Sequence, residues 1–188
     1  MKVIGLSGSR VGSKTRVAMD AAISLFAEKY PDVETELIDL AEYNVEFSDG
    51  RNYLDYTGDT GYVTQAIMEA DALVIGTPIF QASIPATLKN IFDLLPVDAL
   101  RDKVVSIIVT AGSAKHYLIP EVQLKPILAY MKAQIVQTYV FIEEQDFRRK
   151  EITNHDVHLR LERLVEDTVV LTDTFTQTRE AKEAEYDF

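Results

Sequence analysis

The sequence predicts an α/β protein with a parallel β-sheet and helices on both faces. Short apolar runs alternate along the chain with longer segments in which apolar residues recur at helical spacing. Residues 72–76 and 104–109 are almost entirely apolar, as in strands that are covered on both faces. Strands that alternate with helices form parallel sheets through right-handed crossovers. The length of 188 residues suits one domain.

Five strands are expected in chain order. Residues 2–6 form an apolar run, and residues 34–40 alternate imperfectly but have β-forming residues at the right place. The full set is 2–6, 34–40, 72–76, 104–109 and 135–142. Five such strands favour the flavodoxin-like fold, a three-layer sandwich whose parallel sheet has the order 2-1-3-4-5.

Helices are expected between and after these strands. Ala18, Ala21, Ala22 and Leu25 share one helical face, and Pro85 is at a favoured early position of a later helix. The expected helices are 15–29, 62–70, 85–95, 121–132 and 154–178. Residues 1–178 are therefore taken as a single domain, and residues 179–188 as a charged tail that frays. The long polar connection 41–60 carries four aromatic residues that either bind a ligand or pack locally.

The composition excludes several classes of function. A formal net charge of −11 argues against nucleic acid or an anionic membrane as partner. The chain has no cysteine, which excludes disulfides, thiolate zinc sites, iron–sulfur clusters and dithiol chemistry. No run approaches the roughly 20 apolar residues of a membrane span, so a cytoplasmic location is expected.

The loop of residues 5–16 is the strongest candidate for ligand binding. It joins the first strand to the first helix and carries Ser7, Ser9, Ser13 and Thr15 beside several glycines. A helix N-terminus with flexible glycines and hydroxyl donors suits a phosphate monoester. A Walker A loop requires glycine at the place of Ser13, and the dinucleotide spacing Gly-x-Gly-x-x-Gly is not met. The hydroxyl-rich loop of flavodoxin-like proteins fits best.

Two further loops fall at the same edge of the predicted sheet. Residues 77–81 follow the third strand and residues 110–116 follow the fourth, and ligands bind beyond the carboxyl ends of the strands in such sheets. His116 in the third loop is either a donor to the ligand or a histidine that faces solvent. His155 and His158 lie at a helix start, where an ordinary structural role is favoured over a metal site.

Several spaced motifs together resemble the NADPH-dependent FMN reductase family. The motifs are Gly8-Ser9-Arg10 with Ser13 and Thr15, then Thr-Pro-Ile-Phe at 77–80 and Leu-Lys-Asn-Ile-Phe-Asp at 88–93. Within the family, residues 111–116 and 124–128 look most like the reductases that supply reduced flavin to alkanesulfonate monooxygenases.

The resemblance implies a set of cofactor-binding residues and no catalytic residue or metal. Ser9, Arg10, Ser13 and Thr15 are implied to hold the FMN phosphate. The implied lining of the isoalloxazine ring is Pro78, Ile79, Phe80 and Gln81, with Gly112 and Ser113 on its other border. Hydride would pass from the nicotinamide of NADPH or NADH to flavin N5, chemistry that belongs to the cofactors.

Several alternatives remain open at the level of the sequence. A flavodoxin-type electron carrier, a flavin-binding regulatory protein and an azo or quinone reductase all fit the same loops. The preference between NADPH and NADH, the tightness of FMN binding and the final acceptor are also open, a flavin-dependent monooxygenase being one candidate. A homodimer or homotetramer is expected because the helix at 86–95 and the loop at 43–56 offer apolar surface.

Overall fold

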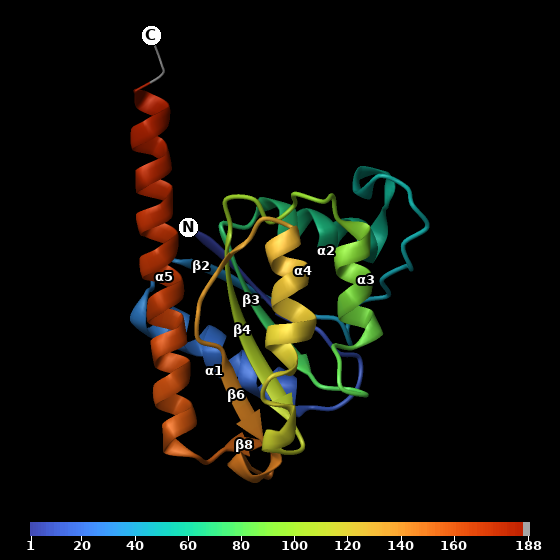
Figure 1. The fold of residues 1–188 in the computed structure, drawn as a ribbon, viewed down its shortest axis with the longest axis vertical. Helices are drawn as coiled ribbons and strands as arrows, with labels where there is room; N and C mark the ends of the chain where they lie inside the picture. The colour runs from blue at the N-terminus through green and yellow to red at the C-terminus, as the bar shows by residue number, and fades with distance from the viewer. Residues whose placement is uncertain (186–188) are drawn as a thin grey trace.

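The computed structural model describes residues 1–185, and its fold is the predicted three-layer sandwich (Figure 1). The parallel sheet runs in the order β2-β1-β3-β4-β5, with β6 also paired to β4, so the expected order is confirmed. The strands of this sheet are β1 (Lys2–Ser7), β2 (Glu34–Asp39), β3 (Ala72–Pro78), β4 (Val104–Ala111), β5 (Gln134–Ile135) and β6 (Val140–Glu143).

The fifth position of the sheet is filled by two short strands instead of the single strand expected at 135–142. β5 pairs with the start of β4 and β6 with its end. Between them the chain leaves the ladder, where the carbonyl of Gln137 accepts a hydrogen bond from Lys125 Nζ at 2.8 Å. The hydroxyl of Tyr139 donates to the carbonyl of Tyr117 at 2.5 Å. These contacts with a preceding segment replace the strand pairing.

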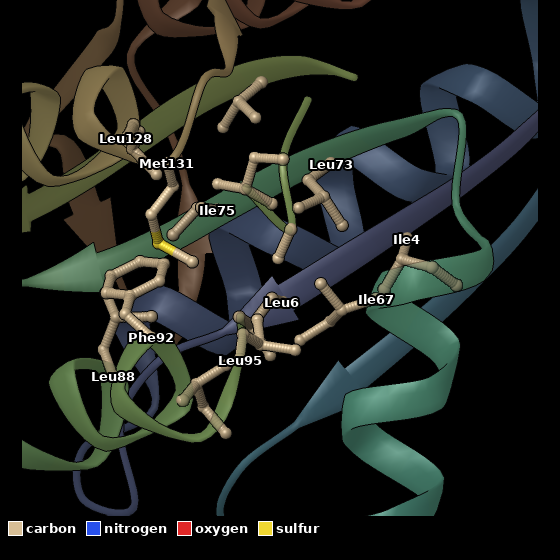
Figure 2. Close-up of a cluster of buried hydrophobic side chains, with 14 of the residues drawn as sticks. Ile4, Leu6, Ile67, Leu73, Ile75, Leu88, Phe92, Leu95, Leu128 and Met131 are labelled. Atoms are coloured by element: carbon tan, nitrogen blue, oxygen red, sulfur yellow. The ribbon is translucent and has the colours of Figure 1, made fainter. Parts of the chain in front are cut away.

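In the part of the chain that the structure describes, five α-helices cover the two faces of the sheet. They are α1 (Lys14–Lys29), α2 (Gly58–Glu69), α3 (Ala86–Leu94), α4 (Lys125–Tyr130) and α5 (His155–Ala184). One apolar core lies between the sheet and α2, α3 and α4, and Figure 2 shows Leu6, Ile75 and Leu88 among its buried side chains. A second core on the other face joins Val3 and Ile108 of the sheet to residues of α1 and α5.

Several elements differ from the expected ones. A π-helix over Pro120–Leu124 precedes α4, where the sequence predicts one continuous helix. After β6, a short 3-10 turn η4 (Glu144–Asp146) leads into a small antiparallel pair, β7 (Phe147–Arg148) and β8 (Glu151–Ile152). Two other 3-10 turns are η1 (Tyr53–Asp55) and η2 (Ala114–His116).

The last helix is longer than expected. α5 continues to Ala184 and does not end at residue 178 as expected. Of the tail expected at 179–188, residues 186–188 lie outside the described ones, and the fraying of the tail stays a prediction. The C-terminal turns of α5 extend past the rest of the molecule in Figure 1. Within residues 1–185, no helix combines the length and apolar character of a membrane span.

Candidate functional site

A cavity of about 460 Å³ lies at the carboxyl edge of the sheet. It is formed by the β1–α1 loop, the ends of β3 and β4, and the turn η4. The lining residues are Val11, Gly12, Ser13, Lys14, Thr15, Pro78, Ile79, Phe80, Thr110, Ala111, Gly112 and Glu144. Its volume is within the range of small-molecule sites, and it joins the three loops that the sequence places at this edge.

Close backbone packing fixes where the β1–α1 loop starts. The N–H of Gly8 donates to the carbonyl of Gly76 at 2.8 Å. A Cβ atom on Gly8 would lie 3.0 Å from Leu88 and 3.1 Å from that carbonyl oxygen. Glycine therefore allows the loop to leave β1 directly against β3 and α3.

The end of the loop exposes the N-terminus of α1 to the cavity. Gly12 has φ +86°, a conformation that favours glycine. Ser13 is the N-cap residue of α1, and within the described residues its hydroxyl makes no capping hydrogen bond. The first-turn N–H groups of a helix lack partners within the helix, so this end of the cavity attracts an anion.

A buried hydrogen bond joins the first loop to the fourth strand. The hydroxyls of Thr15 and Thr110 are 2.7 Å apart, and Thr15 is 5% exposed. The bond holds the first turn of α1 against the carboxyl end of β4. Thr15 therefore fixes the shape of the cavity at the point where both elements line it.

The opposite wall of the cavity is apolar and is shaped by a tight turn. Pro78, Ile79 and Phe80 leave the end of β3, and Phe80 is 40% exposed. Phe80 and Ser83 exchange two backbone hydrogen bonds of 2.9 and 3.0 Å. Gln81 and Ala82 between them have φ of +48° and +57°, which is unusual for residues other than glycine. The turn thus keeps the ring of Phe80 at the cavity, although the backbone of the turn is locally strained.

The predicted site residues divide into two groups. Those that line the cavity are Ser13, Thr15, Pro78, Ile79, Phe80 and Gly112, whereas Ser9, Arg10, Gln81 and Ser113 are outside its described lining. The hydroxyl of Ser9 donates to the carbonyl of Val11 at 2.9 Å and accepts from its N–H at 3.2 Å. The side chain of Arg10 belongs to a separate pocket of about 130 Å³ beside Tyr43 and Phe47.

Two charged residues of the cavity were not among the predicted ones. Lys14 is the first residue of α1, and its ammonium group pairs with the carboxylate of Glu144 in η4. Lys14 lies between the predicted residues Ser13 and Thr15, so the sequence could have indicated that it lies at the site. Glu144 has no such indication, because its place depends on the splitting of the fifth strand.

Arg16, in the first turn of α1, is already paired with acidic residues. Arg16 makes ion pairs with Asp20, Asp39 and Glu42 at 3.0, 3.1 and 2.8 Å. Hydrogen bonds to Asp20 first, and then to Asp39, raise the pKa of Arg16 above its ordinary value. Asp39, the last residue of β2, is thus engaged by Arg16.

The histidines do not form a reactive centre. His116 is half-buried and is not part of the described cavity lining. Nε2 of His158 lies 3.0 Å from the carbonyl oxygen of Ile152. In residues 1–185 no group of three or more His, Cys, Asp or Glu side chains is placed to hold a metal ion. The cavity therefore offers an anion site, an apolar wall and one ion pair, an arrangement suited to positioning a bound group.

Comparison with known proteins identifies the family. Residues 1–147 match the family described as NADPH-dependent FMN reductase. The chain is 39% identical over 170 residues to an NAD(P)H-dependent FAD/FMN reductase of Geobacillus thermodenitrificans, covering 90% of this chain and 92% of the relative. It is 30% identical over 162 residues to the NADH-dependent FMN reductase SfnF of Pseudomonas fluorescens, covering 86% of each.

A solved structure agrees with this result. An oxidoreductase from Corynebacterium diphtheriae is 26% identical and superimposes with a TM-score of 0.73, over 93% of this chain and 98% of that one. The family match covers most of the chain and the relatives align over nearly their whole length. The chain therefore belongs to the NADPH-dependent FMN reductase family and is an oxidoreductase that uses FMN with NAD(P)H as the electron donor.

Proposed function

We propose that FMN binds in the cavity at the carboxyl edge of β1, β3 and β4, and that NAD(P)H approaches its ring from the open side. One observation carries the proposal: one cavity is lined both by the N-terminal turn of α1 and by the apolar residues Pro78, Ile79 and Phe80. FMN has the same two parts, a phosphate and a flat apolar ring. We also propose that residues 1–178 act as one FMN-binding domain.

The residues of the cavity fit this group. At the phosphate end, Ser13 supplies a hydroxyl and the first turn of α1 supplies N–H donors. At the ring end, Ile79 and Phe80 supply an apolar wall. A Cβ atom placed on Gly112 would meet nothing within 4 Å, so its backbone is open to hydrogen-bond the polar edge of a ring. Arg10 is exposed and reaches the phosphate only by leaving its own pocket, so its assignment needs a direct test.

The task of the protein in this reaction is placement. When bound, the flavin supplies the chemistry by accepting hydride from the nicotinamide. Phe80 and Ile79 hold the ring plane and exclude water from one side of it. The bond between Thr15 and Thr110 keeps the phosphate end in register with the ring end. Fixed geometry of this kind lowers the entropic part of the barrier.

The proposal is tested by the rate of NADPH oxidation by flavin-free protein as FMN is added, with NADH run in parallel. Turnover that saturates with FMN is expected, and the two rates give the nucleotide preference. Phe80→Ala should raise the FMN concentration needed for half-saturation. Phe47→Ala is the matched control, because Phe47 is 77% exposed and lies outside the described cavity lining. FMN binding without oxidation of either nucleotide, or equal effects of both variants, would contradict the proposal.

We propose a flavin-dependent monooxygenase as the acceptor of the reduced flavin. The support is the resemblance of residues 111–116 and 124–128 to reductases of that kind. Azo compounds and quinones are the competing acceptors. Transfer of reduced FMN to a monooxygenase across a dialysis membrane is expected if the flavin leaves the protein, whereas direct reduction of a quinone without free FMN argues for the alternative.

The assembly and location are part of the same proposal. A homodimer or homotetramer is supported by an apolar groove of about 540 Å³ between α3 and α4, beside the exposed Val97 and Tyr130. Light scattering at micromolar concentration tests it, and a monomer would contradict it. A cytoplasmic location is proposed because the reaction consumes NAD(P)H.

A further inference from the structure

The cavity has no net side-chain charge before a ligand enters it. Of the described residues that line it, Lys14 and Glu144 are the two charged ones. They form an ion pair with one another, and both side chains remain partly exposed, at 37% and 64%. The positive charge that an anionic ligand would meet at the start of α1 is therefore already neutralised by a carboxylate of the protein.

The turn that carries Glu144 is firmly held. The N–H of Glu143 donates to Oδ2 of Asp146 at 2.8 Å in a capping box around η4. Oδ1 of Asp146 accepts a bond of 2.7 Å from Asn154, the N-cap residue of α5. Asp146 is buried. The carboxylate of Glu144 thus projects from an anchored backbone and stays near the cavity.

A carboxylate at this place opposes the binding of a phosphate. The flavin phosphate is an anion, and like charges a few ångströms apart repel even near a protein surface. The ammonium group of Lys14 also has to be shared between Glu144 and the ligand. Lys14 lies 5.9 Å from the centroid of the Phe147 ring, so contacts on the side of η4 and β7 also hold it.

We propose that Glu144 weakens the binding of FMN by competing with its phosphate for Lys14 and by its own charge. This inference rests on the proposed placement of FMN in the cavity. It concerns the phosphate alone, so a flavin without a phosphate is unaffected by Glu144.

Binding of FMN and of riboflavin, measured separately by quenching of flavin fluorescence, tests the inference. Glu144→Gln removes the charge and preserves the shape of the side chain. Since exposed ion pairs contribute little, FMN affinity should rise by about twofold to fivefold. Riboflavin affinity should not change. Lys14→Met should lower the affinity for FMN and leave that for riboflavin unchanged.

Glu162→Gln is the matched control. Glu162 pairs with Lys29 at 2.7 Å with similar exposure, but at the other end of α1. Glu162→Gln changes the net charge by the same amount as Glu144→Gln, and it should leave FMN affinity unchanged. Equal tightening of FMN and riboflavin by Glu144→Gln, no change in either, or an equal effect of Glu162→Gln would overturn the inference. If the unaltered protein binds neither flavin, the proposed placement of FMN itself fails.

Discussion

Replacing Gly12 by alanine isolates the effect of the backbone conformation of the β1–α1 loop. A Cβ atom at this position would meet nothing within 4 Å, so the substitution creates no clash. The cost comes from φ +86°, because left-handed backbone costs other residues about 1–2 kcal/mol relative to glycine. For a protein of this size, 1 kcal/mol corresponds to about 2–4 °C in melting temperature. We expect Gly12→Ala to lower the melting temperature by about 2 to 8 °C.

Gly112→Ala is the matched control on the other side of the same cavity. Gly112 also has open space around its Cβ position, but its φ is outside the left-handed region. Alanine there should be neutral or stabilise by up to about 1 kcal/mol, by restricting the unfolded chain. Urea unfolding of both flavin-free variants measures the difference. Equal stability of the two variants would refute the assignment of strain to Gly12.

Three further predictions concern the site and the stability of the fold. Ser13→Ala should weaken FMN binding about tenfold, the loss expected for a hydrogen bond to a charged group. Arg10→Ala should weaken FMN binding less. If a fluorescence titration gives the larger loss for Arg10→Ala, Arg10 is the main phosphate ligand and the prediction is wrong. Ala82→Gly should raise the free energy of unfolding by about 0.5–1 kcal/mol in urea, because it relieves left-handed strain in the turn beside the cavity. Lys103 donates to two carbonyl oxygens at the end of α2, and burial holds its pKa below the ordinary 10.5. Between the pKa of Lys103 in the folded protein and 10.5, the unfolded state therefore binds more protons than the folded state, and the free energy of unfolding should rise with pH. Lys103→Met should lack this rise. Identical pH profiles of stability for the variant and the unaltered protein would contradict the prediction.

The regular part of the fold could be predicted from the sequence because its strands are buried on both faces. Runs such as 72–76 and 104–109 are too apolar to lie elsewhere, and the helices between them show clear spacing. These features determine the order of the sheet and therefore the edge at which the loops meet. They are local properties of the chain, which a single sequence contains.

The last third of the chain depends on contacts that are distant in sequence. The break between β5 and β6 is stabilised by Lys125 and Tyr117, which belong to the preceding segment. Within residues 135–142 the apolar residues are interrupted only by Gln137 and Thr138, and two polar residues do not by themselves predict that a strand divides. The charged residues after 178 also suggested a frayed end, yet i to i+4 pairs such as Arg179 with Glu183 are compatible with a longer helix.

Within the site, the sequence predicted which loops meet at the cavity, but two of the predicted side chains are engaged by other groups of the protein. A hydroxyl-rich loop suggests side-chain donors, but the hydroxyl of Ser9 is used by the loop itself, on both polar groups of Val11. Thr15 is likewise engaged by Thr110. The free donors at the cavity are mainly backbone N–H groups of the first turn of α1, which any residue type supplies.

The loops of the cavity could be predicted, but its individual side chains could not. This explains why Lys14 and Glu144, the two residues that set the charge there, were harder to predict. An anion site built from backbone N–H groups leaves no residue signature, so the side chains around it are free to tune affinity. Lys14 and Glu144 neutralise each other at that place and come from opposite ends of the domain sequence. A motif of the β1–α1 loop can contain Lys14. It cannot contain Glu144, because only the folded β6–η4 segment brings that residue to α1. The affinity for phosphate is therefore a property of the tertiary structure, and the comparison of FMN with riboflavin measures it directly.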